Sequence, residues 1–124
     1  MNIPSDRHYT DHDEWVQIDG DIVTIGISDF AQSELGELVF VDLPEVDTEL
    51  EAGEVACEVE SVKAVAEVYS PVSGTVVAVN EDLEDAAESI NSDPYGQWLL
   101  KIKTEGGLPD GLLDAAAYAE KVGG

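Results

Sequence analysis

Hydrophobic and polar residues alternate over short runs along most of the chain, which is the pattern of half-buried β-strands. The clearest run is 54–60, EVACEVE, which places Val55, Cys57 and Val59 on one face and Ala56 with three glutamates on the other. Other runs rich in β-branched residues are 15–18, 22–27, 37–43, 64–70, 75–80 and 98–103. The pattern therefore predicts a mainly β fold.

Turn and stop signals separate these runs. Asp19-Gly20 lies between two of them, and an Asp-Gly pair in that setting predicts a hairpin in which both residues adopt positive φ. Pro44 ends the run 37–43 because it has no N–H to donate to a ladder. Pro71 does the same after 64–70, so that run and 54–60 form two neighbouring strands with a short bend between them.

Helices are expected only at the margins. Ser28 or Asp29 can cap a short helix that stops at Gly36, and an acidic stretch over 81–88 has a weaker helical pattern. An Ala-rich run from about 110 to 122 predicts a C-terminal helix. Acids near its start, and a lysine and a glycine at its end, suit the helix dipole and a C-cap: Asp110, Asp114, Lys121 and Gly123.

Short strands at close spacing predict a small antiparallel β-sandwich or barrel-sandwich hybrid, with short peripheral helices and a C-terminal helix. We expect one domain over 1–124, with the β core at about 20–103 and the helix at about 110–122. The aromatic residues and the single cysteine are expected to pack in the core: Trp15, Phe30, Phe40, Trp98 and Cys57.

The charge of the chain excludes two classes of partner. Asp and Glu number 28 against five Lys and Arg, for a net charge of -23, which repels nucleic acid and anionic membrane surfaces. The acids are dispersed, so they predict a solvated acidic surface suited to a halophilic source. One cysteine, no apolar run of membrane-spanning length and no signal-like start predict a soluble cytoplasmic protein.

One basic residue stands apart from this pattern. Lys63 is the only lysine or arginine between Arg7 and Lys101. It lies between a strand that ends at Glu60 and one that begins near Ala64, so we expect it at the exposed tip of a hairpin. A solvated surface lysine is the ordinary interpretation of such a residue, but its isolation in an acidic chain favours a role that needs a primary amine.

The neighbours of Lys63 favour covalent attachment as that role. Ser61 and Ala64 are small and leave the side chain open, while the branched Val62 restricts the local geometry. Schiff-base catalysis by Lys63 would need a pocket that desolvates the amine, and a hairpin tip does not provide one.

Taken together, these residues resemble the family of the glycine cleavage system H protein, a lipoyl carrier. The resemblance extends over nearly the whole chain, through EWV, VTIGISDFAQSELGELVFVDLPEV, ESVKAVAEVYSPVSGTVVAVNEDL, NSDPYG and WLLKIK. It implies a lipoyl-domain-like fold and a carrier that is not itself an enzyme. It also implies that lipoic acid is joined to Lys63 as N6-lipoyllysine, with Glu60, Ser61, Val62 and Ala64 recognised by the lipoate-attaching enzyme.

The resemblance also implies partners and a role. The lipoyl arm would take the aminomethyl group of glycine from the pyridoxal-phosphate glycine decarboxylase (P protein) to the tetrahydrofolate-dependent aminomethyltransferase (T protein). Dihydrolipoyl dehydrogenase (L protein) would reoxidise it. The loaded ammonium needs a partly dry cleft with a carboxylate, and the resemblance places Glu14 there and Glu67 near it.

Two features near the N-terminus need separate treatment. The family usually has His-Glu-Trp where this chain has Asp13-Glu14-Trp15, with His12 displaced by one position. His8 and His12 with the neighbouring aspartates could be drawn as a metal site, but isolated His and Asp residues near a terminus are usually solvated, and no metal is expected.

Three alternatives to the carrier of glycine cleavage stay open. The first is a biotinyl or lipoyl domain of another multienzyme system, although biotin carriers usually have Met on both sides of the lysine and acyltransferase lipoyl domains usually have Asp before it. The second is a lipoyl-relay protein of lipoate metabolism, which would need the same lysine. The third is an acidic adaptor that carries no prosthetic group.

Overall fold

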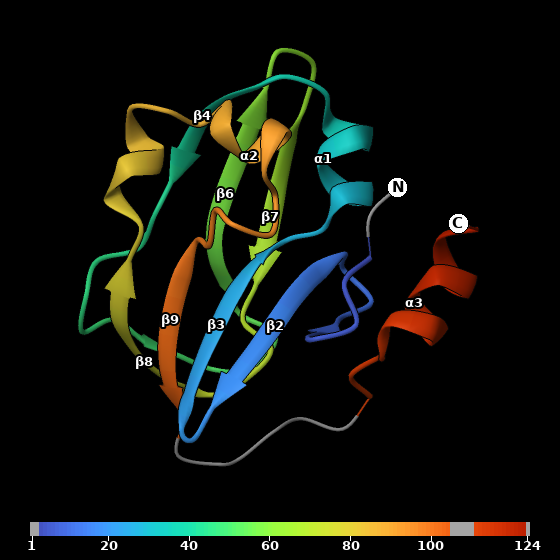
Figure 1. Cartoon of the computed structure of the whole chain (residues 1–124). Helices are drawn as coiled ribbons and strands as arrows, with labels where there is room; N and C mark the ends of the chain where they lie inside the picture. Colours follow the sequence, from blue (N-terminus) through green and yellow to red (C-terminus); the bar gives the residue numbers. More distant parts are fainter. Residues whose placement is uncertain (1–2, 105–110, 124) are drawn as a thin grey trace.

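The computed structural model describes residues 3–104 and 111–123, and in these residues nine strands form two antiparallel sheets (Figure 1). The larger sheet has the order β1-β2-β3-β9-β8-β5 and the smaller one the order β4-β6-β7. The strands are β1 His8–Tyr9, β2 Glu14–Asp19, β3 Ile22–Ile27, β4 Leu38–Asp42, β5 Glu49–Leu50, β6 Val55–Ser61, β7 Val65–Tyr69, β8 Gly74–Val79 and β9 Leu100–Thr104. The predicted mainly β class is confirmed, and the described strands do not close into a barrel.

The predicted hairpin joins β2 to β3, but its turn is one residue further along than expected. Asp19 lies opposite Ile22 in the ladder, so the two central residues are Gly20 and Asp21. Only Gly20 has positive φ, at 64°. Positive φ at the first central position is the pattern of a type II′ turn, in which glycine is favoured at that position.

The helices are short and peripheral, as predicted. In α1, Asp29–Leu35, the hydroxyl of Ser28 accepts a hydrogen bond from the Ala31 N–H, so Ser28 is the N-cap. Gly36 ends this helix at φ 80°. The acidic stretch forms a 3-10 helix, η1 Glu81–Glu84, and α2 follows over Ser89–Ser92.

The C-terminal helix begins later than the expected residue 110. It is α3, Ala115–Val122, with the Asp114 carboxylate capping the Ala117 N–H at 2.8 Å. Leu113 cannot join the helix because its backbone makes a bridge to Tyr9, with two hydrogen bonds of 2.8 Å. Asp110 lies outside the described residues. No described helix has the length and apolar character needed to cross a membrane.

The core has two clusters of buried side chains. The larger cluster collects Val, Ile and Leu side chains from both sheets, together with Cys57. The smaller one contains Tyr9, Trp15 and Tyr118, and the two tyrosine rings stack with centroids 4.6 Å apart. This second cluster holds α3 beside β1 and β2, on the right in Figure 1.

The expectation that all four aromatic residues named from the sequence are core residues is wrong in part. Trp15 is buried, Trp98 and Phe30 are only partly buried, and Phe40 is 48% exposed. A register shift between Leu38 and Phe40 in the β4–β6 ladder explains the last difference, because it breaks the alternation along β4.

A second register shift corrects the predicted alternation of 54–60. It falls between Val55 and Cys57 in the β6–β7 ladder. Val55 is therefore exposed and Ala56 is buried, the reverse of the prediction, while Cys57 and Val59 face the core as expected. Burial raises the pKa of the Cys57 thiol.

Candidate functional site

Lys63 lies in the turn between β6 and β7, as the sequence predicts. Ser61 and Ala64 close this turn: the Ser61 N–H donates to the Ala64 carbonyl at 2.8 Å. The Ser61 hydroxyl oxygen accepts hydrogen bonds from the backbone N–H groups of Lys63 (3.2 Å) and Ala64 (3.0 Å). One buried serine therefore organises the turn that presents the lysine.

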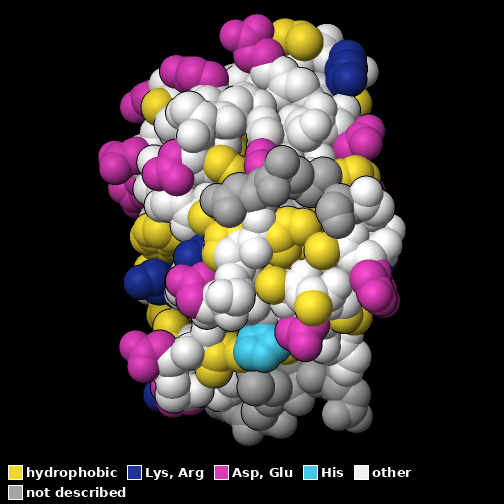
Figure 2. Space-filling view, turned by 45° about the vertical axis from the view of Figure 1, so that its right-hand side comes forward, with side chains coloured by type: hydrophobic (Ala, Val, Ile, Leu, Met, Phe, Trp, Pro, Cys, Tyr) yellow, Lys and Arg dark blue, Asp and Glu magenta, His cyan; other side chains and the backbone are white. Residues whose placement is uncertain are grey.

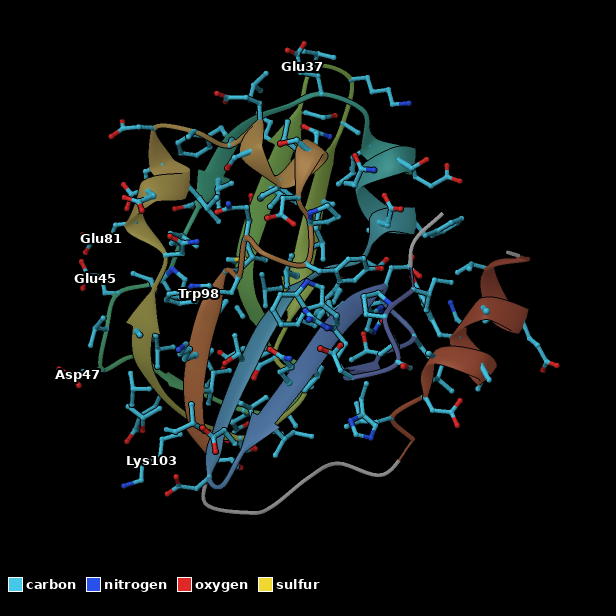
Figure 3. All side chains as sticks on the ribbon, in the orientation of Figure 1. Glu37, Glu45, Asp47, Glu81, Trp98 and Lys103 are labelled. Carbon is cyan, nitrogen blue, oxygen red and sulfur yellow. The ribbon has the colours of Figure 1, made fainter. Side chains whose placement is uncertain are left out.

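The Lys63 side chain is exposed at the end of the hairpin, which projects beyond α1 and α2 in Figure 1. The Val62 N–H donates to the Glu37 carbonyl at 3.1 Å, so the segment before β4 braces the turn from one side. Figure 3 shows Glu37 beside this end of the hairpin. The three salt bridges within the described residues belong to Arg7, Lys103 and Lys121.

Gly36 leaves room beside the stem of the lysine. A Cβ atom at position 36 would lie 3.6 Å from the Lys63 Cε, and Gly36 has positive φ. The side chain is open to solvent on a braced turn, so the residues present fit a covalently attached group on the amine.

The residues predicted to be recognised by the lipoate-attaching enzyme divide into two groups. Ser61 is buried and acts on the backbone of the turn, whereas Glu60, Val62 and Ala64 are exposed around Lys63. The three exposed residues can contact another protein directly, and Ser61 can contribute only through the shape of the turn.

Glu14 is the only carboxylate buried in the described residues, at 1% exposure. Its Oε1 accepts a hydrogen bond of 2.8 Å from the Thr10 hydroxyl, and its Oε2 accepts one of 2.6 Å from the Tyr69 N–H. Thr10 precedes β2 and Tyr69 ends β7, so this carboxylate joins the larger sheet to the smaller one. The sequence identified Glu14 through the resemblance, but nothing in it indicated Thr10 and Tyr69.

Burial raises the pKa of Glu14 to about 7, although the hydrogen bonds from Tyr69 and Thr10 act in the opposite direction and favour the ionised form. The nearby charge of Asp13 raises it further. Near neutral pH the group is therefore present in both forms, and a cation that enters the site would favour the carboxylate.

A pocket of about 200 Å³ opens onto Glu14. Its lining comes from the start of β2 and the segment before it, the segment before β6, the end of β7 and the residues that follow it, and the segment before α3: Thr10, Asp11, His12, Glu14, Gly53, Tyr69, Ser70, Pro71, Gly111 and Leu112. The ring of His12 lies against that of Tyr69, with centroids 4.5 Å apart. The displaced histidine of the sequence thus contributes to the same pocket as Glu14.

Glu67 is not brought into this pocket. It is exposed on β7, two residues before Tyr69, and it faces Glu58 across the β6–β7 ladder. Lys63 is also separate from the pocket: it is not among the pocket-lining residues, and it lies in the turn before β7, whose four residue steps of about 3.3 Å place Tyr69 about 13 Å from Val65.

The N-terminal histidines and aspartates do not gather around a common point. No group of three or more His, Cys, Asp or Glu side chains in the described part of the chain is arranged to hold a metal ion. Asp13 accepts a hydrogen bond of 2.9 Å from the Tyr118 hydroxyl and forms an ion pair of 3.8 Å with Lys121, while His12 lies on Tyr69.

The fold and the site define the class of this protein. It is a mainly β protein with two antiparallel sheets that presents an exposed lysine on a braced hairpin turn. Comparison with known proteins identifies the family. A family model described as glycine cleavage H-protein matches residues 7–123. The chain belongs to this family.

Individual members of the family are similar to this chain over almost its full length. The chain is 54% identical to the glycine cleavage system H protein of Syntrophomonas wolfei, over 97% of this chain and 93% of that protein. It is 48% identical to a probable glycine cleavage system H protein of Natronomonas pharaonis, with 98% of each covered. A solved structure of the glycine cleavage system H protein from Mycobacterium marinum matches with a TM-score of 0.90 and 42% identity, covering 98% of this chain and 99% of that one.

Proposed function

We propose that this chain is the lipoyl carrier of the glycine cleavage system and that lipoate is attached through the Nζ atom of Lys63. Membership of the H-protein family supports the carrier role. The observation that carries the assignment of the lysine is its place in the turn between β6 and β7, where the Ser61 hydroxyl organises the backbone and the amine stays open to solvent.

Attachment is an acyl transfer to the amine. A C–N bond forms between the Lys63 Nζ and the carbonyl carbon of lipoate, the bond from that carbon to the activating group of the acyl donor breaks, and the amine loses a proton to solvent. The bound group supplies a dithiol that can carry a one-carbon unit. The protein supplies the turn, the path along β7 and the Glu14 pocket, and it performs no chemical step of its own.

The Glu14 pocket is proposed to shelter the cationic end of the loaded arm. In its ionised form, the buried carboxylate held by Thr10 and by the Tyr69 N–H offers a positioned negative charge with little surrounding water. Such a charge is stronger than one at the surface because it is less screened. Glu67 is proposed to act earlier on the path, as an exposed acid on β7 between Lys63 and the pocket.

The partners proposed for this chain are the glycine decarboxylase, the aminomethyltransferase and the dihydrolipoyl dehydrogenase of the system, together with a lipoate-attaching enzyme. A cytoplasmic location fits this set. Carboxylates are scattered over the face seen in Figure 2, mostly toward its edges, and a source with a saline cytosol would explain the excess of 28 Asp and Glu over five Lys and Arg.

Intact-mass measurement of the protein purified from cells that lipoylate other proteins tests the attachment. One lipoyl group should be present and should map to Lys63. It should be lost in Lys63→Arg and kept in the control Lys101→Arg, which alters a lysine of β9. A wild-type mass without any addition would contradict the assignment.

A second measurement separates the carrier from a lipoyl relay. The lipoylated protein should stimulate the exchange of glycine carboxyl carbon with carbon dioxide by the cognate decarboxylase. Full lipoylation without any stimulation would favour the relay.

A further inference from the structure

Exposed apolar side chains gather beside Lys63. Val39, Phe40, Val62 and Val65 are 52%, 48%, 68% and 58% exposed. They are four of the seven large hydrophobic residues exposed in the described part of the chain, and all four lie on β4 or in the β6–β7 hairpin. Apolar residues that are scattered singly over a surface need no explanation, whereas a group of this kind marks an interaction site.

The bulge in β4 is what turns two of these residues outward. Leu38 lies opposite Ser61 and Phe40 lies opposite Glu60, so two steps along β4 match one step along β6. Val39 and Phe40 are consecutive and both are exposed, although regular alternation would bury one of them. Bulges commonly redirect side chains next to functional sites, and this one adds an aromatic ring to the surface beside the lysine.

Cross-strand register orders this surface into two rows. The row nearer the turn is Phe40, Glu60 and Val65, and the next row is Asp42, Glu58 and Glu67. We call these six residues, with Val39 and Val62, the hairpin face.

The second row places three exposed carboxylates directly opposite one another on adjacent strands. Like charges in that position destabilise a sheet. The three ion pairs found within residues 3–104 and 111–123 all lie elsewhere, so none of them offsets this repulsion. A cationic surface placed against the row would relieve it.

We propose that the hairpin face is the docking surface for the enzyme that acylates Lys63, and that this enzyme presents an apolar centre bordered by Lys or Arg side chains. The inference rests on the proposed attachment at Lys63. Acylation requires the lysine to enter an active site, so the surface next to the turn is covered while this happens. The apolar residues adjoin the turn and the carboxylates lie behind them, which is the order of an interface core and its polar rim.

Charge selects this occupant over a second copy of the chain. Two copies that met through the hairpin face would bring acidic rows together in a protein with a net charge of -23. A basic partner gains from the same charges, both in the rate of encounter and in orientation.

Steady-state acylation of unlipoylated protein by the cognate ATP-dependent lipoate ligase tests the proposal. Phe40→Ser and Val65→Thr remove apolar contact, and Val65→Thr keeps the branched shape that suits a strand. Each should raise KM about tenfold, the effect of losing about 1.4 kcal/mol of binding, and leave kcat within about twofold. The double variant Glu58→Lys/Glu67→Lys should raise KM by a factor that shrinks as salt is added.

A direct binding measurement supplies a readout that does not depend on turnover. The Lys63→Arg protein cannot be acylated at that position, and its Kd for the ligase should rise by the same factors when the hairpin-face substitutions are added. Melting curves identify any variant that has lost its fold, and Val65→Thr remains as the milder test.

Matched controls lie on the other side of the molecule. Val77 on β8 is 39% exposed, so Val77→Thr tests the loss of an exposed apolar residue in general. Glu45→Lys/Glu81→Lys makes the same charge change away from the hairpin, as Figure 3 shows. The controls should leave KM and Kd within about twofold of wild type.

The outcomes separate this proposal from the proposed function. A wild-type protein that the ligase does not acylate would reject attachment at Lys63. Wild-type acylation with hairpin-face variants that keep a normal KM and Kd would reject the docking surface alone. Equal losses in the hairpin-face variants and in the controls would also overturn it, because the effect would then be one of general charge or solubility.

Discussion

Replacing Glu14 with Gln should change how the stability of the protein depends on pH. Burial raises the pKa of Glu14 from 4.5 to about 7 in the folded protein, and the unfolded chain keeps the ordinary value. Below pH 4.5 the carboxyl is protonated in both states. Between pH 4.5 and 7 the unfolded state loses the proton first, so the free energy of unfolding falls as pH rises.

The size of this effect follows from the two pKa values. The difference between the folded and unfolded pKa values of Glu14 corresponds to about 3 kcal/mol of unfolding free energy, and this stability should be fully lost above pH 7. Because Glu14 is only 1% exposed, solvent screening does not reduce it much. The free energy of unfolding of the wild type minus that of Glu14→Gln should therefore fall by about 3 kcal/mol between pH 4.5 and 8.

Denaturant unfolding at fixed molar salt, repeated across that pH range, measures this difference. Gln keeps the shape of the side chain, and any hydrogen bond it loses to Thr10 or Tyr69 adds a constant that does not vary with pH. Glu67→Gln, which removes an exposed carboxylate, controls for the general effect of one negative charge. A wild-type minus Glu14→Gln difference that stays constant within about 0.5 kcal/mol would refute the argument, as would a carboxyl resonance of Glu14 that titrates near pH 4.5.

Four other perturbations have expected outcomes. Gly26→Ala should lower the free energy of unfolding by about 1–3 kcal/mol in denaturant titrations, because its Cβ would overlap the buried Trp15 ring. Asp47→Gly should raise the free energy of unfolding by about 0.5–1 kcal/mol, because Asp47 has φ 77°, a backbone conformation that glycine adopts more easily. Asp13 also has positive φ, at 65°, but Asp13→Gly should lower the free energy of unfolding, because this substitution removes the carboxylate that binds Tyr118 and Lys121. The melting temperature should rise from low to molar salt because screening weakens repulsion among the 28 acids, and a flat profile would count against a halophilic source.

Local signals in the sequence were enough to locate the lysine. In the sequence an alternating run precedes Lys63 and a β-rich run follows it, and the chain has so few basic residues that this one stands out. The turn between β2 and β3 was also found, but its central residues were misplaced by one. Asp-Gly and Gly-Asp can both occupy a two-residue hairpin turn, and the ladder that chooses between them depends on partners that the local sequence does not specify.

The features missed from the sequence all depend on contacts between distant segments. The bulges in β4 and β6 arise from pairing with another strand, so the exposure of Phe40 and the burial of Ala56 could not be predicted from alternation alone. The resemblance pointed to Glu14, but its hydrogen bond from the Tyr69 N–H joins residues 55 positions apart and could not be predicted from the sequence. The burial that raises the pKa of Glu14 likewise depends on packing between distant segments, whereas the Tyr69 hydrogen bond acts in the opposite direction.

Strand β7 connects the parts of the site that the sequence treats separately. Its first residue, Val65, belongs to the hairpin face beside Lys63, and its last, Tyr69, donates its N–H to Glu14 at 2.6 Å. Side chains two positions apart share a face of a strand, so Val65, Glu67 and Tyr69 line one path from the turn to the pocket. A shift of one residue in the β6–β7 register would move all three to the opposite face, and the path would then be lined by Ala66 and Val68. The pairing of β6 with β7 therefore fixes both the surface that an acylating enzyme would meet and the route that an attached arm would follow.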